Sequence, residues 1–117
     1  MTDQAVSVDE FVEIDELEKM AQAEPGNVEI QRRWAWSLLR TNHAQRAREV
    51  LEGVTNKAAQ DPEVWYALGV VLLRVNETSS AKDSFNKVTT LLAERATESP
   101  RLTMLNHMAE THLRMLE

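Results

Sequence analysis

Hydrophobic residues recur along most of the chain at steps of three and four positions, with polar and charged residues between them. The first series comprises Phe11, Ile14, Leu17, Met20 and Ala21. Such spacing places hydrophobic side chains on one face of an α-helix, because each helical residue advances the turn by about 100°. The pattern therefore predicts a chain of amphipathic helices.

Capping and helix-breaking residues indicate where these helices begin and end. Ser7-Val8-Asp9-Glu10 has the form of a capping box, and Pro25-Gly26 ends the helix that follows it. Asn27, Asp61 and Ser99 are suitable N-caps for later helices, and proline follows the last two. The expected helices run from about 8 to 23, 28 to 41, 44 to 59, 62 to 75, 78 to 97 and 100 to 116. The fifth is expected to be long because neither proline nor glycine occurs in it before Pro100.

The pattern repeats after 34 residues. Equivalent positions carry similar side chains: Trp34 and Leu68, Ala35 and Gly69, Leu38 and Leu72, Leu39 and Leu73, Arg40 and Arg74, Asn42 and Asn76, Ala47 and Ala81, Leu51 and Phe85, and Val54 and Val88. The second copy also has the spacing W-x2-L-G…A-x3-F, formed by Trp65, Leu68, Gly69, Ala81 and Phe85. Ala35 and Ala47 are small side chains at positions where the two helices of a hairpin would approach closely.

These residues resemble the tetratricopeptide repeat (TPR) family. The resemblance implies an all-α fold, a right-handed TPR-like α-solenoid of antiparallel helix hairpins with about six helices. Neighbouring hairpins in such a stack bury one continuous core, because a single hairpin cannot bury its hydrophobic face alone. The expected single domain, residues 1–117, divides into an acidic N-terminal helix or half repeat (1–27), two repeats (28–61 and 62–95) and a C-terminal helix (96–117). A weaker similarity, of architecture only, is to the mitochondrial fission adaptor.

The resemblance also indicates where a partner would bind. In this family the first helix of each repeat lines a concave face, and residues beside the core stripe point into the groove. Here they are Arg32, Arg33, Trp36, Leu39 and Arg40, followed by Tyr66, Val70, Leu73 and Arg74. Hydrophobic side chains flanked by arginines suit a peptide or amphipathic helix with an acidic edge, because guanidinium groups bind carboxylates. Alternatively, Trp36, Leu39 and Leu73 only pack against neighbouring helices, and the arginines pair with nearby glutamates.

One subclass of the family grips the C-terminal carboxylate of chaperones with lysine and asparagine side chains. At those positions this chain has Arg32, Trp36, Tyr66 and Val70. Binding of chaperone tails is therefore not expected.

The last helix carries a second candidate surface. Its core stripe is expected to comprise Leu102, Leu105, Ala109, Leu113 and Leu116, with Met104, Met108 and Met115 on an adjoining side. Methionine side chains favour adaptable contacts, so they form a possible homodimer surface, unless they pack against the preceding helix. We expect a non-catalytic adaptor or scaffold that binds a protein or peptide in its groove, with structural self-association through the terminal helices as the alternative.

Composition narrows the function further. The 117 residues include 13 Lys and Arg and 19 Asp and Glu, and the net charge of -6 disfavours nucleic acid and anionic lipid as partners. Eight of the acidic residues and one basic residue lie within positions 1–25. Cysteine is absent and the three histidines match no catalytic or metal-binding motif, so we expect no cofactor, metal site or enzymatic activity. No window approaches the roughly 18 apolar residues that a membrane span needs, which favours a cytoplasmic protein.

Overall fold

The computed structural model describes the backbone of residues 8–117 and the side chains of residues 14–117. The described residues form six α-helices: α1 (Val8–Ala23), α2 (Val28–Arg40), α3 (Ala44–Lys57), α4 (Pro62–Arg74), α5 (Thr78–Leu91) and α6 (Pro100–Met115). The all-α prediction is confirmed. Ser7 of the expected capping box lies outside the described residues, as do the side chains of Glu10 and Phe11.

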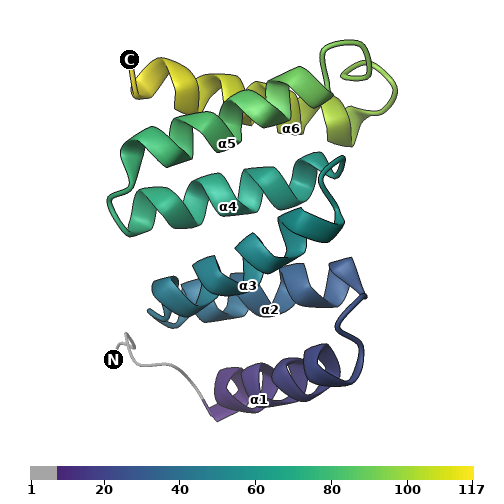
Figure 1. The fold of residues 1–117 in the computed structure, drawn as a ribbon, viewed down its shortest axis with the longest axis vertical. Coiled ribbons are helices and arrows are strands. Elements are labelled where there is room, and N and C mark those ends of the chain that lie inside the picture. Colours follow the sequence, from purple (N-terminus) through teal and green to yellow (C-terminus); the bar gives the residue numbers. More distant parts are fainter. Residues whose placement is uncertain (1–7) are drawn as a thin grey trace.

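Successive helices pack as antiparallel neighbours in one stack that runs from α1 to α6 (Figure 1). In addition, α2 contacts α4 and α4 contacts α6. On the other side of the stack, Arg46 of α3 forms an ion pair with Glu18 of α1 at 2.8 Å. Alternate helices therefore form two layers, and the first helices of the repeats, α2 and α4, share a layer with α6.

Local capping explains why the helices start where they do. Three of the predicted N-cap side chains, those of Asn27, Asp61 and Ser99, accept a hydrogen bond from a backbone N–H in the first turn of the helix that follows. These bonds are Ile30 to Asn27 (3.2 Å), Glu63 to Asp61 (2.9 Å) and Leu102 to Ser99 (3.2 Å). The starts of α2, α4 and α6 are therefore fixed by short-range chemistry.

The ends of α2 and α4 have the same geometry. An asparagine follows each helix with a positive φ angle, 67° at Asn42 and 64° at Asn76. The next residue donates its amide back to the helix over 2.8 Å, from His43 to Leu38 and from Glu77 to Leu72. This is the hydrogen-bond pattern of a Schellman motif, and asparagine tolerates the left-handed conformation that the motif requires.

The core lies between the two layers and depends on small residues at the helix crossings. Ala35 and Ala47 are buried, as expected from the sequence. Gly69 packs directly against the fully buried ring of Phe85, and a Cβ atom at this position would lie 2.7 Å from Cε1 of that ring. The second hairpin therefore needs glycine where the first has Ala35.

The predicted length of the fifth helix is wrong, because α5 ends at Leu91 instead of near residue 97. Leu92 is completely buried, and the chain turns over residues 92–97 before Ser99 caps α6. The Thr103 hydroxyl, on the first turn of α6, donates to the carbonyl of Ala96 and holds this turn in place. Residues 93–96 have good helical propensity, but the return of α6 onto α5 requires the chain to leave the helix axis earlier.

Candidate functional site

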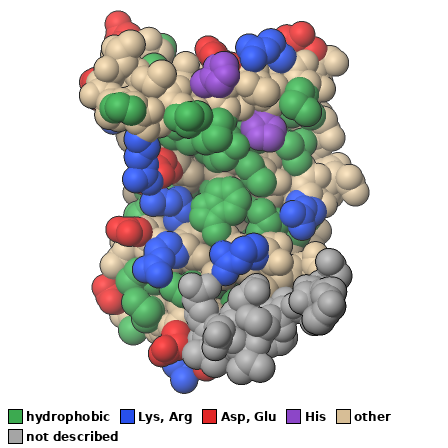
Figure 2. All heavy atoms as spheres, turned by 180° about the vertical axis from the view of Figure 1, so that it is seen from behind, with side chains coloured by type: hydrophobic (Ala, Val, Ile, Leu, Met, Phe, Trp, Pro, Cys, Tyr) green, Lys and Arg blue, Asp and Glu red, His purple; other side chains and the backbone are tan. Residues whose placement is uncertain are grey.

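The predicted groove residues lie in the layer of α2 and α4, and α6 extends this layer. We name this surface the α2–α4–α6 face and define it by a set of side chains from the three helices. They are Arg32, Arg33, Trp36 and Arg40; Tyr66, Val70, Leu73 and Arg74; and Arg101, Met104, Met108, His112 and Met115. Seen from the side opposite to Figure 1, hydrophobic side chains run along the middle of the molecule, with Lys and Arg side chains beside them (Figure 2).

The arginines of this face differ in their surroundings. The Arg32 side chain is only 17% exposed and lies 3.9 Å from an Asp61 carboxylate oxygen and 3.8 Å from one of Glu63. Glu63 also forms an ion pair with Arg101 on α6. Arg32 of α2 therefore pairs with carboxylates at the start of α4, and the Glu63 carboxylate extends the connection to α6.

Arg33, Arg40 and Arg74 are exposed on this face. A guanidinium nitrogen of Arg40 lies 3.4 Å from the Ser37 hydroxyl. Within the described residues, Arg33 and Arg74 form no salt bridge. Their positive charges therefore face solvent.

The predicted hydrophobic groove residues divide into two groups. Leu39 is only 5% exposed and packs within the core, so it offers almost no surface to another molecule. Trp36, Val70 and Leu73 are half-buried, because one side of each packs on the core and the other side remains open. The accessible hydrophobic surface of α2 and α4 thus centres on these three side chains.

Tyr66 is held by an aromatic cluster that joins α4, α5 and α6. Its hydroxyl shares a 3.2 Å hydrogen bond with Nε2 of His112, and its ring lies 5.6 Å from that of Phe85. The His112 imidazole stacks on Phe85 with a centroid distance of 4.5 Å. Burial raises the pKa of the Tyr66 phenol above its ordinary value. These contacts hold the Tyr66 side chain in one position, so it contributes to the fixed surface of the face and is not free to move toward a partner.

The methionines of α6 lie next to the side chains that contact α4. Arg101, Met104, Met108, His112 and Met115 follow one another at steps of three and four residues, so they form one stripe on the helix. The ion pair of Arg101 and the hydrogen bond of His112 place this stripe along α4. Met104 is 58% exposed and Met115 is 75% exposed, whereas Met108 is half-buried. The two surfaces that the sequence suggests separately are therefore continuous.

Sequence analysis assigns no role to Gln31, which is buried and caps the preceding helix. Its side-chain amide donates to the carbonyl of Ala21 over 2.9 Å and to that of Glu24 over 3.4 Å. Trp65, 34 residues further on, also donates to the segment before its helix, from its indole N–H to the backbone carbonyl of Ala59 over 2.8 Å. The 34-residue alignment could have indicated this role, because the equivalent residues Gln31 and Trp65 both carry a side-chain N–H donor.

The described residues contain no group of three or more His, Cys, Asp or Glu side chains that could hold a metal ion. No described helix is both long enough and apolar enough to cross a lipid bilayer.

Comparison with known proteins identifies the repeats. No curated protein matches the chain. The family described as the tetratricopeptide repeat matches residues 14–71, a segment that extends from α1 through α2 and α3 into α4. Domains of this family are generally protein–protein interaction modules and are typically non-catalytic. Residues 14–71 therefore belong to the tetratricopeptide repeat family, and the six helices of the described residues are consistent with such repeats.

Proposed function

We propose that the α2–α4–α6 face binds a segment of a partner protein, either an extended peptide or an amphipathic helix with an acidic edge. The hydrophobic side of this segment would cover Trp36, Val70 and Leu73. Its carboxylates would lie beside the guanidinium groups at the edge of the face.

One observation carries this proposal: half-buried hydrophobic side chains on α2 and α4 lie beside exposed arginines. Partly open aromatic and aliphatic side chains gain free energy when a partner removes them from water. Glu63 is already paired with Arg32 and Arg101, whereas the charges of Arg33 and Arg74 face solvent. An acidic partner is therefore favoured over a basic one.

The test is a selection of peptides from a random displayed library against the purified chain. Enriched peptides are expected to have hydrophobic residues at helical or alternating spacing together with Asp or Glu. Affinity for a labelled peptide would then be measured by fluorescence anisotropy at low and high salt, because exposed ion pairs weaken as salt increases.

Two double variants separate a specific face from a general effect of charge. Arg33→Glu with Arg74→Glu should weaken peptide binding at least tenfold, whereas Arg95→Glu with Arg114→Glu, which changes the net charge equally, should not. All four side chains are exposed, so the melting temperature should change little. Equal binding by both double variants, or selected peptides without acidic residues, would contradict the proposal.

A second candidate function is homodimerisation through the stripe on α6. The observation that favours it is the exposure of Met104 and Met115, two large hydrophobic side chains on one side of the last helix. Light scattering across a range of concentrations would show a dimer that Met104→Glu with Met115→Glu converts to a monomer. A monomer at all concentrations would eliminate this candidate. Because the stripe is continuous with the rest of the face, dimerisation and peptide binding would compete.

A further inference from the structure

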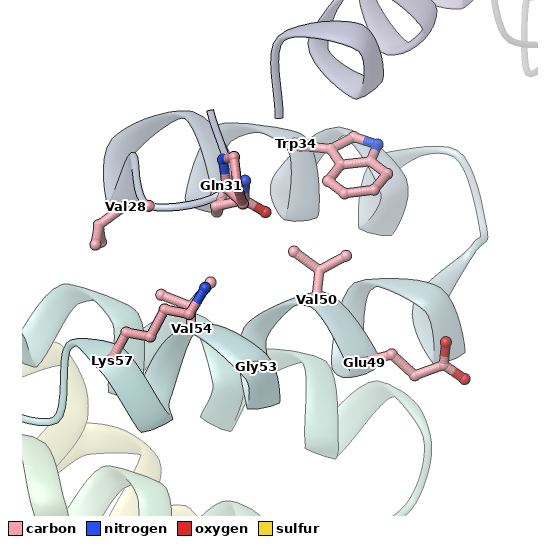
Figure 3. Close-up of a pocket in the computed structure, with 10 residues that line it drawn as sticks. Val28, Gln31, Trp34, Glu49, Val50, Gly53, Val54 and Lys57 are labelled. Carbon is pink, nitrogen blue, oxygen red and sulfur yellow. The ribbon is translucent and has the colours of Figure 1, made fainter. Parts of the chain in front are cut away.

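A second surface of the molecule has an opening that the proposed function does not use. A pocket of about 310 Å³ lies between the α1–α2 turn, α2 and α3 (Figure 3). Its lining comprises Pro25, Gly26, Val28, Gln31, Trp34, Glu49, Val50, Gly53, Val54 and Lys57. Trp34 and Trp36 are two residues apart on α2, so their side chains leave the helix in nearly opposite directions. The pocket is therefore separate from the α2–α4–α6 face.

The second repeat shows what fills the corresponding space. The residues 34 positions after Gln31 and Gly53 are Trp65 and Lys87. Trp65 packs beside the α3–α4 turn, and the Lys87 ammonium lies 5.9 Å from the centre of its indole ring. In the first repeat an amide replaces the indole and glycine replaces the lysine. The pocket exists because these two side chains are smaller.

Nothing in the fold of the described residues requires glycine at position 53. A Cβ atom there would have no neighbouring atom within 4 Å, and the backbone is helical without a positive φ angle. Glycine inside a helix is unfavourable compared with alanine, so a residue that breaks this local rule without a packing reason suggests a functional one. Gly69, in contrast, has Phe85 directly against it.

We propose that this pocket binds one aromatic side chain from a peptide segment of a partner protein, in the place that the Trp65 indole occupies in the second repeat. Val28, Val50 and Val54 supply a hydrophobic lining. Lys57 extends from α3 toward α2 at one end of the pocket (Figure 3), where its ammonium can lie over an inserted ring as Lys87 does over Trp65. The volume is at the lower limit of small-molecule sites, roughly 300 to 1,000 Å³, so it suits a single side chain.

The three tryptophans of the chain allow a direct test, because their indole N–H signals report on three different places. Trp34 lines the pocket, Trp36 lies on the α2–α4–α6 face, and Trp65 fills the equivalent space in the second repeat. The full chain, labelled with ¹⁵N, would be titrated with N-acetyl-tryptophanamide and, as the control probe, N-acetyl-alaninamide. We expect saturable shifts of the Trp34 signal with the first probe only.

Variants connect the signal to the pocket. Gln31→Trp with Gly53→Lys copies the second repeat and should abolish the Trp34 shift, whereas Arg114→Ala, on α6 and outside the pocket lining, should retain it. If the double variant does not fold, Gly53→Leu alone occupies open space and should weaken binding of the probe about tenfold or more.

The results that would overturn the proposal are distinct from those that bear on the α2–α4–α6 face. Shifts centred on Trp36 would assign the aromatic probe to that face instead of the pocket. The absence of any shift at Trp34 up to the solubility limit of the probe would show that the pocket binds no aromatic group. Shifts of Trp34 with protein concentration alone would assign the pocket to a second copy of the chain.

Discussion

The contact between Gly69 and Phe85 gives the sharpest prediction about stability. Replacing Gly69 with alanine would place a methyl carbon 2.7, 2.8 and 3.0 Å from three carbon atoms of the Phe85 ring. This ring is fully buried and stacks on His112 at 4.5 Å, so it has little room to move away. The substitution therefore overpacks the second hairpin.

The magnitude follows from two opposing terms. Overpacking a core costs about 1 to 3 kcal/mol, and the tight contact with an immobile ring favours the upper part of that range. Alanine also gains about 1 kcal/mol over glycine in a helix interior, which offsets part of the cost. We expect Gly69→Ala to lower the free energy of unfolding by about 1 to 2 kcal/mol, a decrease of about 5 to 10 °C in melting temperature.

Two matched variants isolate the contact. Gly53→Ala makes the same chemical change on α3, where the new methyl group meets nothing within 4 Å, and it should stabilise the chain by about 0.5 to 1 kcal/mol. Phe85→Leu recreates the leucine that the first repeat has as Leu51, opposite Ala35. In the Phe85→Leu background, Gly69→Ala should leave the free energy of unfolding unchanged or raise it, because the first repeat already combines alanine at position 35 with leucine at position 51.

The double-mutant cycle comprises the unmodified chain, Gly69→Ala, Phe85→Leu and the double variant. Urea unfolding followed by circular dichroism would measure the free energy of unfolding of all four, and thermal scans would check their order of stability. The reasoning requires a coupling free energy of about 1 kcal/mol or more between positions 69 and 85. If Gly69→Ala is as stable as the unmodified chain, or loses the same free energy whether residue 85 is Phe or Leu, then close packing is not the reason for this glycine.

Further predictions concern other contacts. Tyr66 is the single tyrosine of the chain, and burial raises its pKa in the folded state, so the phenol of the unfolded chain loses its proton at lower pH. The free energy of unfolding should therefore fall as pH rises through the ordinary tyrosine range. Urea unfolding at alkaline pH should show a smaller decrease for Tyr66→Phe than for the unmodified chain. At neutral pH the same variant should cost about 0.5 to 1.5 kcal/mol for the lost hydrogen bond with His112, and an unchanged urea midpoint would contradict this. Asn76→Gly should retain stability in thermal scans, whereas Asn76→Val should cost about 1 to 2 kcal/mol because φ is positive there; equal melting temperatures would refute the Schellman interpretation. Arg32→Ala should lose about 1 kcal/mol, with a smaller loss in high salt, and a salt-independent loss would point to packing of its stem instead of its ion pairs.

Several features of the fold could be predicted because their causes are local. Asn27, Asp61 and Ser99 cap helices through atoms two or three residues away, so a short stretch of sequence contains the whole interaction. The spacing of hydrophobic residues likewise determines which side of a helix is buried. The division into repeats at residues 28, 62 and 96 stays a prediction.

The candidate site could be predicted only in outline. The 34-residue alignment places Leu39 and Leu73 at equivalent positions, yet Leu39 is buried and Leu73 is half-buried. Leu39 lies on α2, which contacts α1, whereas Leu73 lies on α4, which contacts α6, and these two flanking helices differ in sequence. Equivalent positions in a repeat therefore share a direction on the helix but not the same exposure.

By itself, the sequence determined the helices, their caps, the repeat period and the family, because each depends on spacing along the chain. Only the tertiary structure decided that Arg32 of α2 pairs with carboxylates at the start of α4, that α5 ends at Leu91, and that the methionines of α6 continue the face of α2 and α4. It also separated two glycines of the same chain, one pressed against Phe85 and one beside an open pocket. The physical reason is that these properties depend on distances between helices, which are set by how all the side chains of the stack pack together.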